Sequence, residues 1–375
     1  MRRITDWGVL VTPVRFATRR TLLRLAALIG CIGAGVGITL GPGSAGAVST
    51  HPVTHNSNHY VVGLFGDMPY GDAAKAQYPN LLADLNAHDL AFSAFDGDLK
   101  AGGDAMCSDD LYTRQLSAFN SLRAPLIFTP GDNDWTDCWG RYGPGTGGFD
   151  PEERLNHERQ VFFTTHRSLG QHTIKLQRQS DIPGPYAAYS ENALWRKGPV
   201  VYVTLNVQGS NDNLAHLDVP EDVGAPPYTR SPAEIARQDA EHYARLAADK
   251  QWLSDAFAYA KSVQALGVMV IWQADPNFNN EQHIAANEYD GLADITEALR
   301  RQTMAFSGQV VLVHGDSHYF KVDQPLTSDS GTVLANFTRV ETWGASNVHW
   351  VSAEIDPSAP TLFTFRSMIV PADVS

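Results

Sequence analysis

The fold can be predicted from one stretch of sequence, Leu90-Ala91-Phe92-Ser93-Ala94-Phe95-Asp96-Gly97-Asp98. Here a short apolar run passes directly into a Gly-Asp pair. The same order recurs at three other places, where the run ends in Phe65-Gly66-Asp67, Pro130-Gly131-Asp132-Asn133-Asp134 and His314-Gly315-Asp316-Ser317-His318. Apolar runs of this length are typical of buried strands in a layered α/β domain. Such strands bring their carboxyl ends to one edge of the sheet, where ligands bind. We therefore expect the four Gly-Asp pairs to meet.

Carboxylates gathered at one edge would repel one another. A bound cation is the usual remedy, because carboxylate oxygens prefer hard metals. A single Gly-Asp pair is ordinarily a turn with a side-chain hydrogen bond. Four pairs in the same context favour a shared site, so the sequence predicts a cation at the strand ends.

Strand and helix patterns alternate after residue 59. The predicted strands are residues 60–65, 90–95, 126–129, 200–206, 268–272 and 310–313, and the predicted helices are residues 73–86, 111–122, 151–169, 231–262 and 292–306. The tail indicates strands at 333–337, 339–343, 349–355 and 361–365, while residues 140–149 and 208–230 indicate loops, the second long enough to act as a lid. We interpret residues 60–375 as one mixed α/β domain.

The first 47 residues have the pattern of an export signal. Thr18-Arg19-Arg20-Thr21-Leu22-Leu23 precedes an apolar stretch over residues 25–40, and Ala45-Gly46-Ala47 offers a small-residue cleavage site. We interpret residues 1–47 as a signal peptide of twin-arginine type, followed by a short polar segment over residues 48–59, and expect a secreted or periplasmic bacterial protein. The alternatives are an uncleaved membrane anchor and, because of Cys31, a lipoprotein signal.

Charge and composition limit the partners. With 375 residues, 43% of them hydrophobic and 18% charged, the chain has the composition of an ordinary globular protein. Removing residues 1–47, which hold six arginines and one aspartate, leaves 22 basic and 40 acidic residues and a net charge of −18. This charge repels polyanions, so we expect no nucleic-acid partner. Cleavage removes the apolar stretch with the signal, so we expect no stable membrane insertion afterwards. A phosphate-bearing substrate would need a local positive centre, which metal ions could supply.

Cys107 and Cys138 remain after removal of the signal, and each follows a Gly-Asp pair. In an oxidising compartment we expect an isolated pair of this kind to form a disulfide, which would join the loops after the second and third strands. The alternative is a pair of thiolate metal ligands, although a zinc site would combine them with closer-spaced Cys and His.

Asp67, Gly97-Asp98, Gly131-Asp132-Asn133-Asp134 and Gly315-Asp316-Ser317-His318 resemble, in order and spacing, the motifs of the calcineurin-like metallophosphoesterases. That family's pattern is Asp-x-His, Gly-Asp, Gly-Asn-His-Asp/Glu, a lone His after a strand, and Gly-His-x-His. The resemblance extends over residues 60–355. It implies an α/β fold, namely a four-layered α/β/β/α sandwich with two mixed sheets, of which the strand-rich tail completes the second. It also implies a two-metal site that hydrolyses small-molecule phosphoesters.

The resemblance also implies roles for individual residues. Asp98 would bridge two divalent ions, and the implied metal ligands are Asp67, Asp98, Asp132, Gln273, Asp316 and His318. Asp96 and Asp134 would support these ligands through hydrogen bonds.

Four positions depart from the family pattern, because Pro69, Asn133, Gln273 and Asp316 stand where the family has histidine. The resulting oxygen donors favour Mn²⁺, Mg²⁺, Ca²⁺ or an iron ion over zinc, and a single ion could replace two. Asn133 stands at the position of the family's proton donor to the leaving group. Another group must then donate this proton, with His314 and His157 as candidates, or the leaving group must depart without a proton donor.

The predicted function is therefore metal-dependent phosphoester hydrolysis, in which a dinuclear, oxygen-rich site activates water and Asn133 and His314 are the predicted catalytic residues. The missing imidazoles motivate a rival from another class, a non-hydrolytic protein that binds metal or an anionic ligand on the same fold. A structural Ca²⁺ site without chemistry is the third interpretation.

Overall fold

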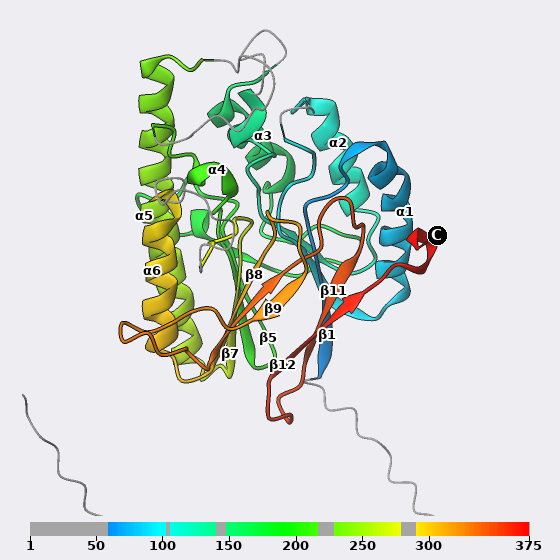
Figure 1. Ribbon diagram of the computed structural model, residues 1–375, viewed down its shortest axis with the longest axis vertical. Helices are drawn as coiled ribbons and strands as arrows, with labels where there is room; N and C mark the ends of the chain where they lie inside the picture. The colour runs from blue at the N-terminus through cyan, green and yellow to red at the C-terminus, as the bar shows by residue number, and fades with distance from the viewer. Residues whose placement is uncertain (1–58, 103–105, 140–147, 217–228, 279–289, 375) are drawn as a thin grey trace, which may run out of the picture. The chain divides into compact units, whose positions relative to one another are not determined.

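The computed structural model describes residues 59–374 except 103–105, 140–147, 217–228 and 279–289. The described residues form two sheets with helices outside them (Figure 1). The five-stranded sheet has the order β12-β11-β1-β2-β3 and contains β1 (Tyr60–Phe65), β2 (Leu90–Phe95), β3 (Leu126–Phe128), β11 (Trp350–Ile355) and β12 (Phe363–Met368). Strands β1, β2 and β3 are parallel, so the first three Gly-Asp pairs follow neighbouring carboxyl ends.

The seven-stranded sheet has the order β4-β5-β6-β7-β8-β10-β9. Its strands are β4 (Gln177–Arg178), β5 (Ala193–Lys197), β6 (Val200–Thr204), β7 (Gly267–Ile271), β8 (Gln309–His314), β9 (Lys321–Asp323) and β10 (Phe337–Glu341). Strands β6, β7, β8 and β10 are parallel, and the outer strands are antiparallel to their neighbours. Both sheets are therefore mixed, as expected.

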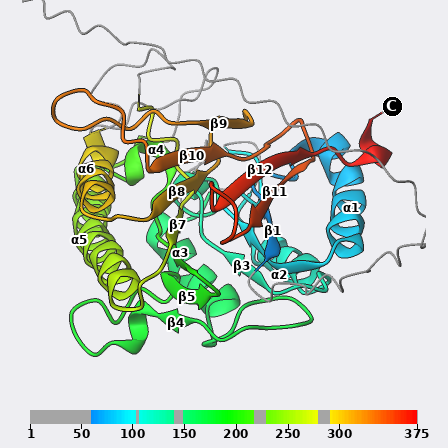
Figure 2. The ribbon, with the colours of Figure 1, turned by 90° about the horizontal axis from the view of Figure 1, so that it is seen from below.

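Helices cover the outer face of each sheet. Apolar side chains of α1 (Gly71–Ala87), α2 (Asp109–Phe119) and α3 (Pro151–Phe162) pack against the five-stranded sheet, and those of α5 (Pro232–Ser262) and α6 (Asp290–Met304) pack against the seven-stranded sheet. Seen along another direction, α5 and α6 again lie on one side of the strands and α1 and α2 on the other (Figure 2). The predicted α/β/β/α sandwich is confirmed.

Strand β8 shows how the layers are joined. Val311 and Val313 belong to the core between the two sheets, whereas Val310 and Leu312 belong to the core beneath α5 and α6. Both faces of the strand are thus removed from water, which explains why the central strands are continuous apolar runs in the sequence.

Local signals set several helix starts. The Ser231 hydroxyl accepts a hydrogen bond from the Glu234 backbone N–H, the Glu234 carboxylate accepts one from the Ser231 N–H, and Pro232 opens α5, as the sequence predicts. Ser108 caps α2 and Asp150 caps α3 in the same way.

Three expectations about elements need correction. The predicted strand over residues 333–337 is wrong, because Val333 forms only an isolated bridge to Thr327, residues 335 and 336 make a turn, and the strand begins only at Phe337. Helix α3 ends at Phe162 rather than near residue 169, where Leu169 instead pairs with Leu126. The tail completes both sheets rather than the second alone, because β11 covers the otherwise open edge of β1.

Some predictions lie outside the described residues. They are the signal peptide over residues 1–47, nearly all of the polar segment over 48–59, most of the loop over 140–149, and the central part of the lid-like loop, residues 217–228. Within the described ranges, no helix is both long and apolar enough to cross a membrane.

Candidate functional site

The predicted site residues follow the carboxyl ends of strands from both sheets. Asp67 follows β1, Asp98 follows β2 and Asp132 follows β3, while Gln273 follows β7 and Asp316 follows β8. Hydrogen bonds connect Asp67 to Asp316 and Asp132 to Gln273 across the two sheets, and Gln273 to Asp316 within the seven-stranded sheet. The structure thus brings together side chains that are up to 249 residues apart in sequence.

Asp67 and His318 form one side of the site. Both carboxylate oxygens of Asp67, which is fully buried, lie within 3.1–3.2 Å of the Asp316 backbone nitrogen. His318 Nε2 lies 3.4 Å from Asp67 Oδ1, and its Nδ1 lies 2.9 Å from the Ala345 carbonyl oxygen. Burial alone would lower the pKa of His318, but the hydrogen bond to Asp67 and the charge of Asp67 raise it.

Asp98 lies at the centre and accepts hydrogen bonds from two side chains. Asn133 Nδ2 is 2.6 Å and the Tyr70 hydroxyl is 2.8 Å from Asp98 Oδ2, and Asn133 Nδ2 also lies 3.0 Å from the Tyr70 oxygen. The Asn133 backbone N–H donates to Asp98 Oδ1. Burial, followed by repulsion from Asp132 and Asp67, raises the pKa of Asp98.

Asp132 and Asp316 form the other side, with the Gln273 amide between them. Gln273 Nε2 is 3.2 Å from Asp132 Oδ1 and 3.2 Å from Asp316 Oδ1. Burial, with repulsion from Asp316, raises the pKa of Asp132 to about 7. Burial also raises the pKa of Asp316 to about 8, and repulsion from Asp67 contributes to this increase.

The backbone directs these side chains from conformations that most residues avoid. Asp67, Asp98, Asp316 and His318 have φ angles of 51°, 67°, 75° and 64°, all in the left-handed region. Left-handed residues of this kind cluster at functional sites, because the surrounding structure has to hold them there.

The repeated Gly-Asp pair has a packing explanation. A Cβ at Gly131 would lie 2.0 Å from Asp98 Oδ1, and a Cβ at Gly315 would lie 2.0 Å from Asp67 Oδ2. Each glycine therefore leaves room for the carboxylate of a different motif. The pairs recur because the carboxylates approach the neighbouring backbone this closely.

The predicted supporting residues Asp96 and Asp134 are both buried behind the site. Asp134 accepts the backbone N–H groups of Asp98, Leu99 and Gly131, which ties the second motif to the third. Burial raises the pKa of Asp134 to about 6, although these hydrogen bonds oppose the shift. Asp96 accepts a hydrogen bond from the Thr342 hydroxyl.

Neither candidate proton donor forms a hydrogen bond to these carboxylates within the part of the chain that the structure describes. His314 is fully buried as the last residue of β8, its Nδ1 is 2.9 Å from the Gly315 oxygen, and its Nε2 has no partner among the described residues. Strand alternation places His314 on the face of Val310 and Leu312, beneath the helices. His157 belongs to α3, where its Nε2 is 3.4 Å from Asp109.

The predicted disulfide is confirmed. Cys107 and Cys138 are bonded, with their Cα atoms 5.6 Å apart. The bond connects the segment before α2 to the turn after Asp134, and so closes the loops that follow β2 and β3.

A left-handed turn next to the site was not predicted. The four residues from Ser210 to Asn213 all have φ between 47° and 64°. The turn places the Ser210 hydroxyl 3.0 Å from Asp132 Oδ2 and 2.8 Å from Asp137 Oδ1. Its sequence, Gly-Ser-Asn-Asp-Asn, is rich in residues that tolerate this conformation, and that was the available signal.

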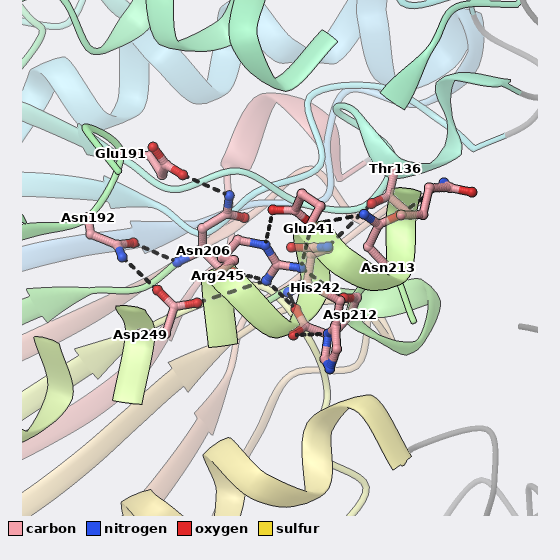
Figure 3. A network of polar contacts seen from close by, with 12 residues as sticks. Thr136, Glu191, Asn192, Asn206, Asp212, Asn213, Glu241, His242, Arg245 and Asp249 are labelled. Carbon is pink, nitrogen blue, oxygen red and sulfur yellow. Dashed lines mark hydrogen bonds and ion pairs between the residues drawn. The ribbon is translucent and has the colours of Figure 1, made fainter. Parts of the chain in front are cut away.

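A buried network holds this turn in place (Figure 3). The Arg245 guanidinium of α5 donates to Asp212 Oδ1 at 2.6 Å, to the Asp212 carbonyl oxygen at 2.8 Å and to the Asn206 carbonyl oxygen at 2.6 Å. His242 Nδ1 lies 2.8 Å from the same Asp212 carbonyl oxygen. Arg245 therefore compensates the buried Asp212 carboxylate and supports the strained backbone.

Lys100 was also missed, since no motif marks it. Its side chain is buried, and its Nζ donates to the carbonyl oxygens of Ala101 and Gly102. Burial lowers the pKa of Lys100, while the nearby charges of Asp137 and Asp134 oppose this shift. It brings a positive charge close to the carboxylates.

The donor chemistry of the site fits a hard divalent cation, because buried carboxylates from separate strands repel one another. Within the part of the chain that the structure describes, however, no group of three or more His, Cys, Asp and Glu side chains is arranged to hold a metal ion. The Gln273 amide lies between Asp132 and Asp316, whereas Asp67 faces the His318 imidazole. Asp98, next to them, accepts hydrogen bonds from the Asn133 amide and the Tyr70 hydroxyl.

Comparison with known proteins gives a limited result. No protein-family model matches the chain, and no curated protein matches it. Among solved structures, a phosphopantetheinyl hydrolase from Mycobacterium tuberculosis is similar with a TM-score of 0.41 and 13% identity, over 77% of this chain and 91% of that one. GAP50, the anchor in the inner membrane complex of Plasmodium, gives 0.36 and 8%, over 83% and 89% of the two chains. A 5'-nucleotidase from Candida albicans gives 0.40 and 10%, over 84% and 51%. TM-scores below 0.5 are too low to assign an activity to this chain.

Proposed function

We propose that this protein hydrolyses phosphoesters with the help of a divalent cation bound by its strand-end carboxylates. The proposal depends on one observation, the convergence of four carboxylates at one edge of the sheets: Asp67, Asp98, Asp132 and Asp316. Hydrogen bonds link their surroundings, and the carboxylates are close enough for their charges to repel one another. Buried acids of one sign attract a cation and then offer it to an anionic ester. The motif order described above supports the same chemistry.

Different residues of the chain would bind the cation and orient its ligands. Asp67, Asp98 and His318 would hold the cation, while the Asn133 amide and the Tyr70 hydroxyl orient Asp98. When bound, such a cation would supply Lewis-acid chemistry, polarising a phosphoryl oxygen and lowering the pKa of water. The Asn133 amide nitrogen donates to Asp98 and to the Tyr70 hydroxyl, so donation to a phosphoryl oxygen would take the place of the hydrogen bond to Tyr70.

The proposal gives no imidazole the role of acid toward the leaving group, because His314 is fully buried beneath the helices. The rate should then depend strongly on the leaving group's own acidity. Aryl phosphates with acidic leaving groups should be good substrates, and alkyl phosphates should be poor ones.

The finer expectations belong to the same proposal. They are a dinuclear site that includes Asp132, Asp316 and Gln273, a preference for Mn²⁺, Mg²⁺, Ca²⁺ or an iron ion over zinc, and export directed by residues 1–47. Protein purified from the medium or periplasm, with its amino terminus near residue 48, would support the last of these.

The test is an assay of p-nitrophenyl phosphate and bis(p-nitrophenyl) phosphate after chelation and after reloading with each metal. We expect chelation to abolish hydrolysis, Mn²⁺ to restore it, and Asp98→Asn to remove it. Asp72→Asn, an exposed aspartate in the first turn of α1, is the matched control and should keep full activity. A metal-loaded protein that hydrolyses neither ester contradicts the proposal.

One observation favours a second function, metal or anion binding without hydrolysis. The amides of Asn133 and Gln273 donate to Asp98, Asp132 and Asp316, where imidazoles were expected from the family pattern. Tight binding of an anionic ester by the metal-loaded protein, with no turnover over many hours, would support this function over hydrolysis.

A further inference from the structure

We propose that the Gln273 amide takes the place that a second cation would need, so that each chain binds one divalent ion. This inference rests on the proposed metal-dependent function and revises its predicted dinuclear form. The single ion would bind on the side of Asp67, Asp98 and His318.

The amide nitrogen of Gln273 lies midway between two carboxylates from different strands. Nε2 is 3.2 Å from Asp132 Oδ1, beyond β3, and 3.2 Å from Asp316 Oδ1, beyond β8. An amide NH₂ has two hydrogens, and this geometry uses one for each carboxylate. A cation shared by Asp132 and Asp316 would have to occupy the same space.

The orientation of the amide is fixed by its other end. The Gly209 backbone N–H donates to Gln273 Oε1 at 2.6 Å, inside the protein. Turning the amide over would point its NH₂ at the Gly209 N–H and its oxygen at two carboxylates. Only the observed orientation satisfies all these groups, so Gln273 does not offer its oxygen to a metal.

The Gln273 backbone cannot shift to release the side chain. Its N–H donates to the Val207 oxygen at 3.0 Å, and its carbonyl oxygen accepts the Gly315 N–H at 2.9 Å. Gly209 is held as well, because the left-handed turn that follows it is bound through Asp212 to the buried Arg245 (Figure 3). The amide is therefore anchored from two directions.

On the opposite side, the Asn133 amide and the Tyr70 hydroxyl donate to Asp98. Among the described residues, however, no side-chain amide separates Asp67 from His318, whose imidazole faces the Asp67 carboxylate directly. The Asp67 oxygens meet one backbone N–H and the His318 imidazole, and the His318 Nε2 faces the carboxylate. Because the other ring nitrogen is within hydrogen-bonding distance of the Ala345 carbonyl oxygen, Nε2 can act as a metal ligand when the ring is neutral. One ion bound here would lie beside Asp98.

The experiment measures the Mn²⁺ stoichiometry of the full chain. Elemental analysis at saturating Mn²⁺ gives the number of ions bound, and electron paramagnetic resonance distinguishes an isolated Mn²⁺ from a coupled pair. We expect one isolated ion in the wild-type protein and two coupled ions in Gln273→His, whose imidazole can ligate. Gln177→His, which adds a histidine at an exposed position in β4, should still bind one.

Each outcome decides a separate point. Two coupled ions in the wild-type protein overturn the inference and leave the proposed function standing. No bound ion overturns both. One ion in the wild-type protein and still one in a folded Gln273→His variant overturns the assignment to Gln273. If Gln273→His does not fold, the wild-type stoichiometry and the equivalent count in Gln273→Glu decide the question.

Discussion

Replacing Glu341 with glutamine removes a buried acid that fixes the turn of the last Gly-Asp motif. Glu341 is fully buried at the end of β10, and its Oε1 accepts hydrogen bonds from the Tyr319 backbone and the Ser317 hydroxyl, both at 2.9 Å. Its Oε2 has no hydrogen-bond partner among the described residues, although the Lys321 ammonium lies 3.8 Å away and opposes the effect of burial. Burial accordingly raises the pKa of Glu341 from 4.5 to about 7.

The sign of the effect follows from proton binding. Between pH 4.5 and about 7 the folded protein keeps the Glu341 proton that the unfolded chain has released, so stability falls as pH rises. Each pH unit costs about 1.4 kcal/mol, which gives about 3 kcal/mol over this range. Glutamine keeps an acceptor at Oε1 and does not titrate. The free energy of unfolding of Glu341→Gln should therefore rise by about 3 kcal/mol relative to wild type between pH 4.5 and 7.

Urea unfolding of both proteins at several pH values, with chelator present throughout, measures this difference. A constant offset between the two proteins is acceptable, because glutamine loses and gains contacts that do not depend on pH. A stability difference that stays flat from pH 4.5 to 7 would refute the reasoning.

Three further predictions concern the surroundings of the site. Arg245→Met should destabilise the fold by about 3–5 kcal/mol in urea unfolding, because it leaves the Asp212 carboxylate buried without its partner, whereas Arg114→Met on the exposed face of α2 should change little. Replacing both cysteines with serine should cost about 4 kcal/mol by the loop-entropy relation for a separation of 31 residues, and an unchanged urea midpoint would contradict this. Ser210→Ala should lower kcat/KM about tenfold through the lost hydrogen bonds to Asp132 and Asp137 with the fold intact, so equal steady-state kinetics would rule out the assigned role of the hydroxyl.

The parts of the fold that the sequence predicts are those with local causes. Central strands such as β8 are recognisable because both faces are buried, and α5 is recognisable because Ser231, Pro232 and Glu234 form its start. The short strands β4 and β9 carry too few residues for a pattern. They form because the neighbouring strands, β5 and β10, provide hydrogen-bond partners for their backbones.

The site, too, has features that the sequence predicts and features that depend on long-range contacts. The Gly-Asp pairs are visible in sequence, because close approach of a carboxylate to the backbone requires glycine at Gly131 and Gly315. The role of Gln273 is not visible, since it depends on the Gly209 N–H, 64 residues away, and on Asp132, 141 residues away. The family resemblance implied a metal ligand at this position, whereas these long-range contacts make the amide nitrogen of Gln273 a hydrogen-bond donor.

The most direct measurement of the central claim is anomalous X-ray scattering at the manganese edge from crystals equilibrated with Mn²⁺. We predict one anomalous peak within ligand distance of Asp67, Asp98 and His318, and no peak between Asp132 and Asp316. Full-length protein crystals that show no manganese at these strand ends, at a Mn²⁺ concentration that supports hydrolysis, would contradict the claim.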